Sequence, residues 1–273
     1  MVDFVFLDSG TGGIPYLLHL KEKCPETSCV YVGDTANFPY GEKTHEEIVR
    51  CVLECVDKII KRFAPKVIVI ACNTMSVNAL DVLRSVYSDQ LFVGTVPAIK
   101  VAAECSKNHC IGLMATNSTV NHQYNQDLKN HFAADCRMVT RGDPELISFI
   151  EHKAFMASEA EIEEACKPSI EYFRKEGCDV IILGCTHFLN VSRQLKKVAG
   201  AEIKIVDSRE GVVNRALSIR GTVGVGDPSF VNTQSKSDIT DTLYVTGFSD
   251  KKDQNEYELI CKKNNLLFGG ILK

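Results

Sequence analysis

Two cysteines, Cys72 and Cys185, are the residues of this sequence with the clearest potential for chemistry. Each follows a short apolar run that predicts a buried β-strand, VIVIA before Cys72 and VIILG before Cys185, and each is followed by polar residues. In parallel α/β folds, ligands bind at the carboxyl ends of strands. Helix-end amides and nearby donors can stabilise a thiolate at such a position. Taken singly, a strand-end cysteine is more often an inert core thiol.

The two cysteines occupy equivalent places in an internal repeat. Residues 59–76 read IIKRFAPKVIVIACNTMS and residues 170–188 read IEYFRKEGCDVIILGCTHF, so each copy has a helix, a turn, a buried strand and then the cysteine. Upstream of each copy lies another strand that ends in small polar residues, FVFLDSG and CIGLMATNST. The sequence therefore predicts two copies of one α/β unit that face each other about a pseudo-twofold axis.

Two thiols on opposite sides of one carbon can invert a stereocentre, because one removes a proton and the other returns a proton to the opposite face. The α-hydrogen of an amino acid is a very weak acid, so the site must hold the carbanion among fixed donors away from water. Asn73, Thr74, Thr186 and strand-end amides can supply those donors. His187 can tune a thiol, although a packed, hydrogen-bonded core histidine is its alternative interpretation. The pair predicts racemisation.

The segment Asp8–Gly13, DSGTGG, forms a strand-to-turn-to-helix junction whose amides can cradle an anion. It fails the nucleotide signatures, because a Walker loop needs G-K-[ST] and Pro15 stands where the last glycine of G-x-G-x-x-G belongs. The alternative is a tight turn that permits close helix packing. The turn residues from Gly33 to Gly41 also follow a strand, and by themselves they predict only a loop.

Apolar strand-like runs alternate with amphipathic helical stretches, and this alternation predicts an α/β fold. The strands FVFLD, CVYVG and VIVIA precede helices predicted at 14–23, 44–63 and 74–87. Thr44 with Glu47, and Ser158 with Glu161, are capping-box signatures. Pro168 is expected to kink or divide the second helix. The pattern favours two pseudo-symmetric domains, each a mainly parallel sheet flanked by helices, with the active site in the interdomain cleft.

We expect the first domain to comprise residues 1–97 plus 208–273, with Cys72, and the second to comprise residues 98–207, with Cys185. The segment Thr222–Thr242 is rich in Thr, Ser, Asp and Gly and predicts a surface loop. A final strand (243–246) and helix (255–264) follow it. Two chain crossings between the domains suit a hinged closure that excludes water.

Composition narrows the function further. The chain of 273 residues has a net charge of −4 and a pI near 6.0. It therefore lacks the net positive charge that is typical of proteins that bind nucleic acid or an anionic membrane. Its apolar runs are strand-sized rather than the roughly 18 residues that a membrane helix needs, and no secretory signal is recognisable. The twelve cysteines form no C-x-x-C pair, so most are expected to be buried thiols of a cytoplasmic protein without a metal site.

The motifs resemble, in order, those of the glutamate racemases of the Asp/Glu racemase superfamily. The matches span nearly the whole chain and together form a highly specific set. They are DSGTGG at 8–13, GDTANFPYGEKT at 33–44, ACNTMS at 71–76, ATNSTV at 115–120, FIE at 149–151, GCTHF at 184–188 and YVTG at 244–247.

The resemblance implies a two-domain enzyme that interconverts L- and D-glutamate without a cofactor or metal and supplies D-glutamate for peptidoglycan. It implies that Cys72 is the base toward D-glutamate and Cys185 the base toward L-glutamate, with Asp8, Glu151 and His187 as auxiliary catalytic groups. The implied substrate-binding residues are Ser9, Asp34, Pro39, Tyr40, Gly41, Asn73, Thr74, Thr116, Thr119 and Thr186.

Two alternatives stay open at this point. One is a racemase or isomerase of the same superfamily that acts on aspartate or a related diacid, against which His187 argues because aspartate-type relatives tend to read Gly-Cys-Thr-Glu there. The other is a non-catalytic protein that binds a small dicarboxylate on the same paired domains. A nucleotide-binding enzyme is a distant third, and a homodimer is an open alternative to a monomer.

Overall fold

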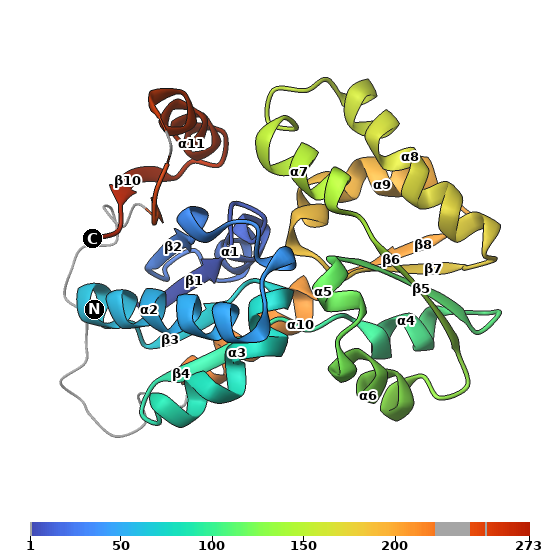
Figure 1. Cartoon of the computed structure of the whole chain (residues 1–273), viewed down its shortest axis with the longest axis horizontal. Helices are drawn as coiled ribbons and strands as arrows, with labels where there is room; N and C mark the ends of the chain where they lie inside the picture. Colours follow the sequence, from blue (N-terminus) through green and yellow to red (C-terminus); the bar gives the residue numbers. More distant parts are fainter. Residues whose placement is uncertain (1, 222–240, 249) are drawn as a thin grey trace.

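The computed structural model describes residues 2–221, 241–248 and 250–273, and Figure 1 shows two lobes. The two ends of the chain form one lobe, and the middle of the chain forms the other. The first lobe contains a six-stranded sheet and the second a four-stranded sheet, each flanked by helices. The predicted α/β fold is confirmed.

The first sheet has the strand order β10-β9-β2-β1-β3-β4 and the second has the order β6-β5-β7-β8. All of the strand pairs are parallel. The run β2-β1-β3-β4 therefore matches β6-β5-β7-β8 strand for strand, so the repeat seen in the sequence is a repeat of topology. The first-lobe strands are β1 (Phe4–Asp8), β2 (Cys29–Gly33), β3 (Val67–Ile70), β4 (Leu91–Gly94), β9 (Thr242–Val245) and β10 (Leu267–Ile271), and the second-lobe strands are β5 (Cys110–Ala115), β6 (Arg137–Gly142), β7 (Val180–Leu183) and β8 (Lys204–Val206).

Helices cover both sheets and set the division between the lobes. The helix that ends at Cys105 packs on β7 and β8, and the helix that begins at Arg209 packs on β3, β4 and the first helix. The α-helices are α1 (Ile14–Lys23), α2 (His45–Phe63), α3 (Asn73–Val86), α4 (Ile99–Cys105), α5 (Asn117–Val120), α6 (Gln123–Phe132), α7 (Pro144–His152), α8 (Glu159–Lys175), α9 (Ser192–Ala199), α10 (Arg209–Gly221) and α11 (Lys251–Lys263), and the 3-10 helices are η1 (Thr35–Asn37), η2 (Tyr40–Glu42) and η3 (Thr186–Val191).

The helices α2 and α8, which precede the two cysteine-bearing strands, begin with the same device. Thr44 accepts a hydrogen bond from the Glu47 amide while the Glu47 carboxylate accepts one from the Thr44 amide, and Ser158 and Glu161 repeat this arrangement. Each box satisfies amides that the first helical turn leaves free. Both predicted capping boxes are confirmed.

Pro168 does not divide α8, which runs from Glu159 to Lys175 as one helix. A proline removes one backbone hydrogen bond, here the one that the Glu164 carbonyl would accept. Both Pro168 and Glu164 are exposed, so solvent can satisfy the freed carbonyl. Of the two predicted effects, a kink or a division, the division is therefore wrong.

The carboxyl-terminal segment contains more structure than the sequence predicts. The final strand and helix are present as β9 and α11, and β10 follows them as the edge strand of the first sheet. Most of the surface loop predicted at 222–242 lies outside the described residues. Within the described residues, no helix combines the length and apolarity needed to cross a membrane.

The strands β3 and β7, which precede the two cysteines, and the strand β1 beside β3 are entirely buried. Every residue of β1, β3 and β7 is buried, as expected for central strands with helices on both faces. Such strands give the two cysteine positions a rigid support.

Candidate active site

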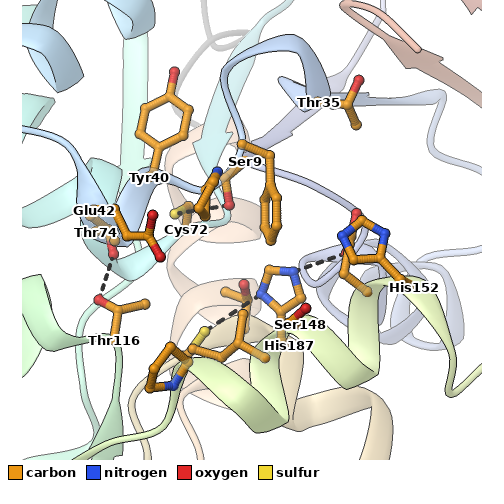
Figure 2. Close-up of a pocket in the computed structure, with 18 of the residues that line it drawn as sticks. Ser9, Thr35, Tyr40, Glu42, Cys72, Thr74, Thr116, Ser148, His152 and His187 are labelled. Atoms are coloured by element: carbon orange, nitrogen blue, oxygen red, sulfur yellow. Dashed lines mark hydrogen bonds and ion pairs between the residues drawn. The ribbon is translucent and has the colours of Figure 1, made fainter. Parts of the chain in front are cut away.

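A cavity of about 690 Å³ lies between the lobes, within the size range of small-molecule sites. Both Cys72 and Cys185 line it, and each is about 5% exposed. Figure 2 shows Ser9, Cys72 and Thr74 on one side of this cavity and His187 on the other. The two thiols therefore line one shared space.

Cys72 follows β3 directly and is the N-cap of α3. Its sulfur lies 3.9 Å from the Ser9 hydroxyl oxygen. The N-terminus of α3 carries free amides and the positive end of the helix dipole. This side of the cavity therefore offers backbone and hydroxyl donors to an anionic ligand.

Cys185 follows β7 and is the N-cap of η3. Its sulfur lies 3.5 Å from Nδ1 of His187, and Nε2 of the same ring lies 2.9 Å from a carboxylate oxygen of Glu151. The side chains of His187 and Glu151 are each about 3% exposed. The arrangement is a buried thiol–imidazole–carboxylate chain.

The ionisation of Cys72 and Asp8 is disfavoured by their surroundings. Burial raises the pKa of the Asp8 carboxyl. The charge of His187 and hydrogen bonds from backbone amides oppose that shift. Burial also raises the pKa of Cys72 well above its usual value, and the nearby Asp8 and Cys185 raise it further. Cys72 is therefore a thiol near neutral pH before substrate binds.

Glu151 and His187 shift each other's pKa toward their charged forms. Burial acts to raise the pKa of Glu151, but hydrogen bonds and charge from His187, with donors from Thr11, lower it overall. Burial likewise acts to lower the pKa of His187, but its bonds to Cys185 and Glu151 raise it well above its usual value. Two buried carboxylates of one site, Asp8 and Glu151, thus have pKa values shifted in opposite directions.

The glycine-rich turn binds protein carboxylates. The Gly13 amide donates a 2.8 Å hydrogen bond to Asp8, and the Thr11 hydroxyl donates a 2.7 Å hydrogen bond to Glu151 of the other lobe. A Cβ atom on Gly10 would lie 2.5 Å from Glu151, and one on Gly12 would lie 2.8 Å from His187. Gly10 and Gly12 are needed because the opposite lobe packs directly against their backbone.

The acidic groups of the site already accept bonds from protein donors. Besides Gly13, the Tyr31 hydroxyl donates to Asp8 at 3.2 Å, and the Thr186 hydroxyl lies 3.4 Å from both carboxylate oxygens. Such surroundings suit a carboxylate that tunes neighbouring groups better than one that holds a metal ion.

Most of the predicted substrate-binding residues line the cavity, and they come from both lobes. The Thr74 hydroxyl lies 3.0 Å from that of Thr116 across the lobes, as Figure 2 shows. Within the described chain, both polar side-chain atoms of buried Asn73 lack a hydrogen-bond partner, so they are available to a ligand. The predicted residues that line the cavity are Ser9, Pro39, Tyr40, Gly41, Cys72, Asn73, Thr74, Thr116, Glu151, Cys185, Thr186 and His187.

Three predicted residues, Asp8, Asp34 and Thr119, do not line the cavity. Asp34 is hydrogen-bonded to the Tyr40 hydroxyl and to Thr246, and the Thr119 hydroxyl lies 3.1 Å from that of Thr74. These residues lie behind the cavity wall, where they hold the wall residues in position.

Sequence reasoning missed several wall residues that come from distant segments. Phe38 packs against His152 and His187, with ring centroids 5.9 and 5.7 Å away. Tyr257 of α11 also lines the cavity. Phe38 lies within the quoted motif at 33–44 and His152 directly follows the one at 149–151, which was the available signal, whereas nothing local marks Tyr257.

The cavity residues fall within the part of the chain that matches known proteins. The Asp/Glu/Hydantoin racemase family model matches residues 18–216. A glutamate racemase of Treponema pallidum (strain Nichols) is 37% identical over 98% of this chain and 96% of its own length. One of Shewanella loihica is 32% identical over 90% of this chain and 93% of its own length.

A solved structure is similar over the whole length of the chain. Escherichia coli glutamate racemase, in complex with L-glutamate and the activator UDP-MurNAc-ala, has a TM-score of 0.83 and 26% identity, and the match covers 99% of this chain and 98% of that one. The similarity extends across both lobes, so it includes the cavity between them.

Proposed function

This chain belongs to the Asp/Glu/Hydantoin racemase family, and from that premise we propose that it racemises glutamate with two cysteine bases and no cofactor. The observation that carries the proposal is the position of Cys72 and Cys185. They come from equivalent strand ends of two repeated units, and both line one cavity. Two-base inversion needs this placement, because the two thiols must reach opposite faces of one carbon.

In the L-to-D direction, the Cys185 thiolate removes the α-proton of L-glutamate. The α-carbon becomes planar, and the Cys72 thiol delivers its proton to the opposite face, which leaves Cys72 as the thiolate. The reverse direction begins with that thiolate. The thiol state of ligand-free Cys72, which follows from its burial beside Asp8, matches the form that accepts L-glutamate.

Substrate binding falls to the unpaired Asn73 amide and to the amides at the start of α3. Helix N-termini favour anions, so the α-carboxylate binds there and its developing negative charge is stabilised as the proton leaves. Thr74, Thr116 and Thr186 add hydroxyl donors from both lobes. Because these donors come from both lobes, a bound glutamate favours a closed cavity, which excludes water.

His187 and Glu151 act on the Cys185 side. The His187 imidazole lies 3.5 Å from the sulfur, so in its charged form it stabilises the thiolate electrostatically, while the sulfur itself accepts the proton taken from the substrate. Asp8 acts on the Cys72 side, where its charge raises the pKa of that thiol. Asp34 and Thr119 support Tyr40 and Thr74, respectively.

The wider context is also part of the proposal. A D-glutamate product fits a role in peptidoglycan synthesis in the cytoplasm, as the relationship to the racemases suggests. The division into residues 1–97 plus 208–273 and residues 98–207 is supported by the packing of α4 and α10 on opposite sheets. A hinge at these two crossings would open the cavity to substrate.

Isotope exchange tests the proposal. Pure protein is incubated with L-glutamate in deuterium oxide without added cofactor, and we expect deuterium at the α-carbon together with loss of optical rotation. Aspartate, tested in parallel, should react far more slowly, and the reverse preference would favour the diacid alternative. Absence of both signals, with titratable thiols and folded protein, would contradict racemisation and favour a binding protein.

A further inference from the structure

A second pair of cysteines meets at the opposite end of the second sheet from the cavity. Cys110 is the first residue of β5, and Cys178 lies in the turn between α8 and β7. Their sulfur atoms are 3.6 Å apart, and their residues are 8% and 4% exposed. Both are free thiols. Nothing in the proposed proton transfer uses them.

Backbone and side-chain bonds fix the two cysteines in place. The Asp179 amide donates to the Cys110 carbonyl at 3.1 Å, and the Cys178 amide donates to the Phe173 carbonyl at 3.0 Å. The Asn108 side chain accepts from the Cys110 amide at 3.0 Å and donates to the Gly177 carbonyl at 2.9 Å. The contact between the sulfurs is therefore held by the chain on both sides.

A permanent positive charge adjoins one sulfur of the pair. Arg137 Nη2 donates to the Cys110 sulfur at 3.3 Å, while Nη1 donates to a Glu176 carboxylate oxygen at 3.1 Å. The Arg137 side chain is 56% exposed, so the pair lies directly beneath a surface residue. Burial, and then Cys110, raise the pKa of Cys178 to about 12, which keeps Cys178 as a thiol.

We propose that Cys110 and Cys178 are a redox modification site, which hydrogen peroxide converts into a reversible intradomain disulfide. The Cys110 sulfur attacks one peroxide oxygen and becomes a sulfenic acid while hydroxide leaves, which takes up a proton to form water. The Cys178 sulfur then attacks the Cys110 sulfur, and its proton leaves with the hydroxyl group as a second water. Overall, two thiols and one peroxide give one disulfide and two waters.

The geometry requires only a small movement. The sulfurs must approach from 3.6 Å to about 2.05 Å, which side-chain rotation can provide. The positive charge of Arg137 stabilises the attacking Cys110 sulfur as it loses its proton. It also stabilises the hydroxide that leaves the peroxide. The disulfide links β5 to the turn before β7, the two strands whose other ends carry Thr116 and Cys185.

The test uses full-length protein with glutamate present, so that the catalytic thiols are shielded. After limiting hydrogen peroxide, free thiols are alkylated and unreduced peptides are analysed by mass spectrometry. We expect a cross-linked Cys110–Cys178 peptide that a dithiol reductant removes, and a Tm several degrees above that of the reduced protein, because the cross-link restricts the unfolded chain. If both thiols stay reduced at a peroxide dose that oxidises other cysteines, the proposal fails.

Matched variants test the roles of the two partners. Cys178→Ser should leave a sulfenic acid on Cys110 that a cyclic 1,3-diketone traps, whereas Cys166→Ser, a buried cysteine of the same lobe, should still form the cross-link. Arg137→Leu should slow cross-linking by about tenfold or more, the order expected from loss of an adjacent positive charge. The guanidinium of Arg174 donates instead to the carbonyls of Val198 and Ala199, so Arg174→Leu should not slow cross-linking. Equal rates in the two arginine variants would overturn the role of Arg137.

Discussion

The two cysteine sides of the cavity share a backbone plan and differ in their side-chain chemistry. Cys72 and Cys185 both end a buried strand in an extended conformation, with φ of −141° and −127°. Cys72 then lies beside Ser9 and the buried Asp8, whereas Cys185 lies beside an imidazole paired with Glu151. The repeat therefore provides the symmetry of two bases, and the residues that differ between its copies provide the unequal protonation that a turnover requires.

Thermodynamics limits how the difference between the two cysteine sides can appear in the kinetics. L- and D-glutamate have equal free energies in water, so kcat/KM must be equal in the two directions whatever the enzyme does. The inequality between Cys72 and Cys185 can therefore appear only in kcat and KM taken separately, in isotope effects and in pH profiles. These quantities are the ones that test the comparison.

Removal of either thiol should have the largest effect. Cys72→Ala and Cys185→Ala should each lower racemisation by about 10⁴-fold or more, the upper end of general acid–base contributions, because inversion needs both bases. The change removes one small buried group, so circular dichroism should show a folded protein. Optical rotation measures the loss. Near-normal turnover by either variant would contradict the two-base assignment.

Single-thiol variants should also reveal which face each cysteine serves. Cys72→Ala retains Cys185, so it should exchange the α-hydrogen of L-glutamate with deuterium oxide faster than that of D-glutamate, without inversion. Cys185→Ala should show the opposite preference. Proton NMR at the α-carbon measures both rates. Identical preferences in the two variants would contradict the assignment of one face of the α-carbon to each cysteine.

Loss of His187 should unbalance the two sides. His187→Asn keeps a polar group near Cys185 but loses the charge, so both kcat/KM values should fall by about 10²-fold, the lower end of general acid–base contributions. Proton removal by Cys185 should become rate-limiting. The substrate deuterium isotope effect on kcat should then grow for α-deuterated L-glutamate and not for the D-enantiomer.

The control for His187 lies on the other side of the cavity. Ser9 adjoins Cys72, so Ser9→Ala should give a smaller loss and should enlarge the isotope effect for α-deuterated D-glutamate instead. The same pattern in both variants would mean that the two side chains do not act on separate cysteines.

Loss of the Glu151 charge should appear mainly in the pH profile. Glu151 raises the pKa of His187, so Glu151→Gln should lower it and move the alkaline limb of activity to lower pH by about one unit or more. The folded pKa of His187 is raised, so its stabilising contribution is complete below its ordinary value near 6.5 and disappears as pH rises through the folded value. Glu151, with a lowered pKa, contributes above its ordinary value and loses its contribution in acid.

Rate and stability profiles from acid to alkaline pH measure these shifts. Glu145→Gln, on the exposed first turn of the same helix, is a matched control and should leave the alkaline limb in place. If the alkaline limb of the activity profile does not shift in Glu151→Gln, His187 does not take part in the proton transfer.

Local patterns predicted the parts of this molecule that depend on neighbours in the chain. The strand FVFLD, the two capping boxes and the paired cysteine motifs could be identified because each is set by a few adjacent residues. The contact between Thr11 and Glu151 spans 140 residues, so no local pattern contains it. The strand β10 was missed because Gly269 and Gly270 weaken its strand signature, although the Tyr244 ring occupies the space where a Gly269 side chain would lie.

The smallest effect tests the repeat itself rather than the chemistry. Because α2 and α8 occupy equivalent positions and begin with the same capping box, Thr44→Ala and Ser158→Ala should each lower the free energy of unfolding by about 1 kcal/mol. Lys58→Ala and Glu171→Ala, at exposed positions later in the same helices, should change it little. Urea unfolding measures all four, and unequal losses at the two caps would show that the shared signature has different energetic roles in the two lobes.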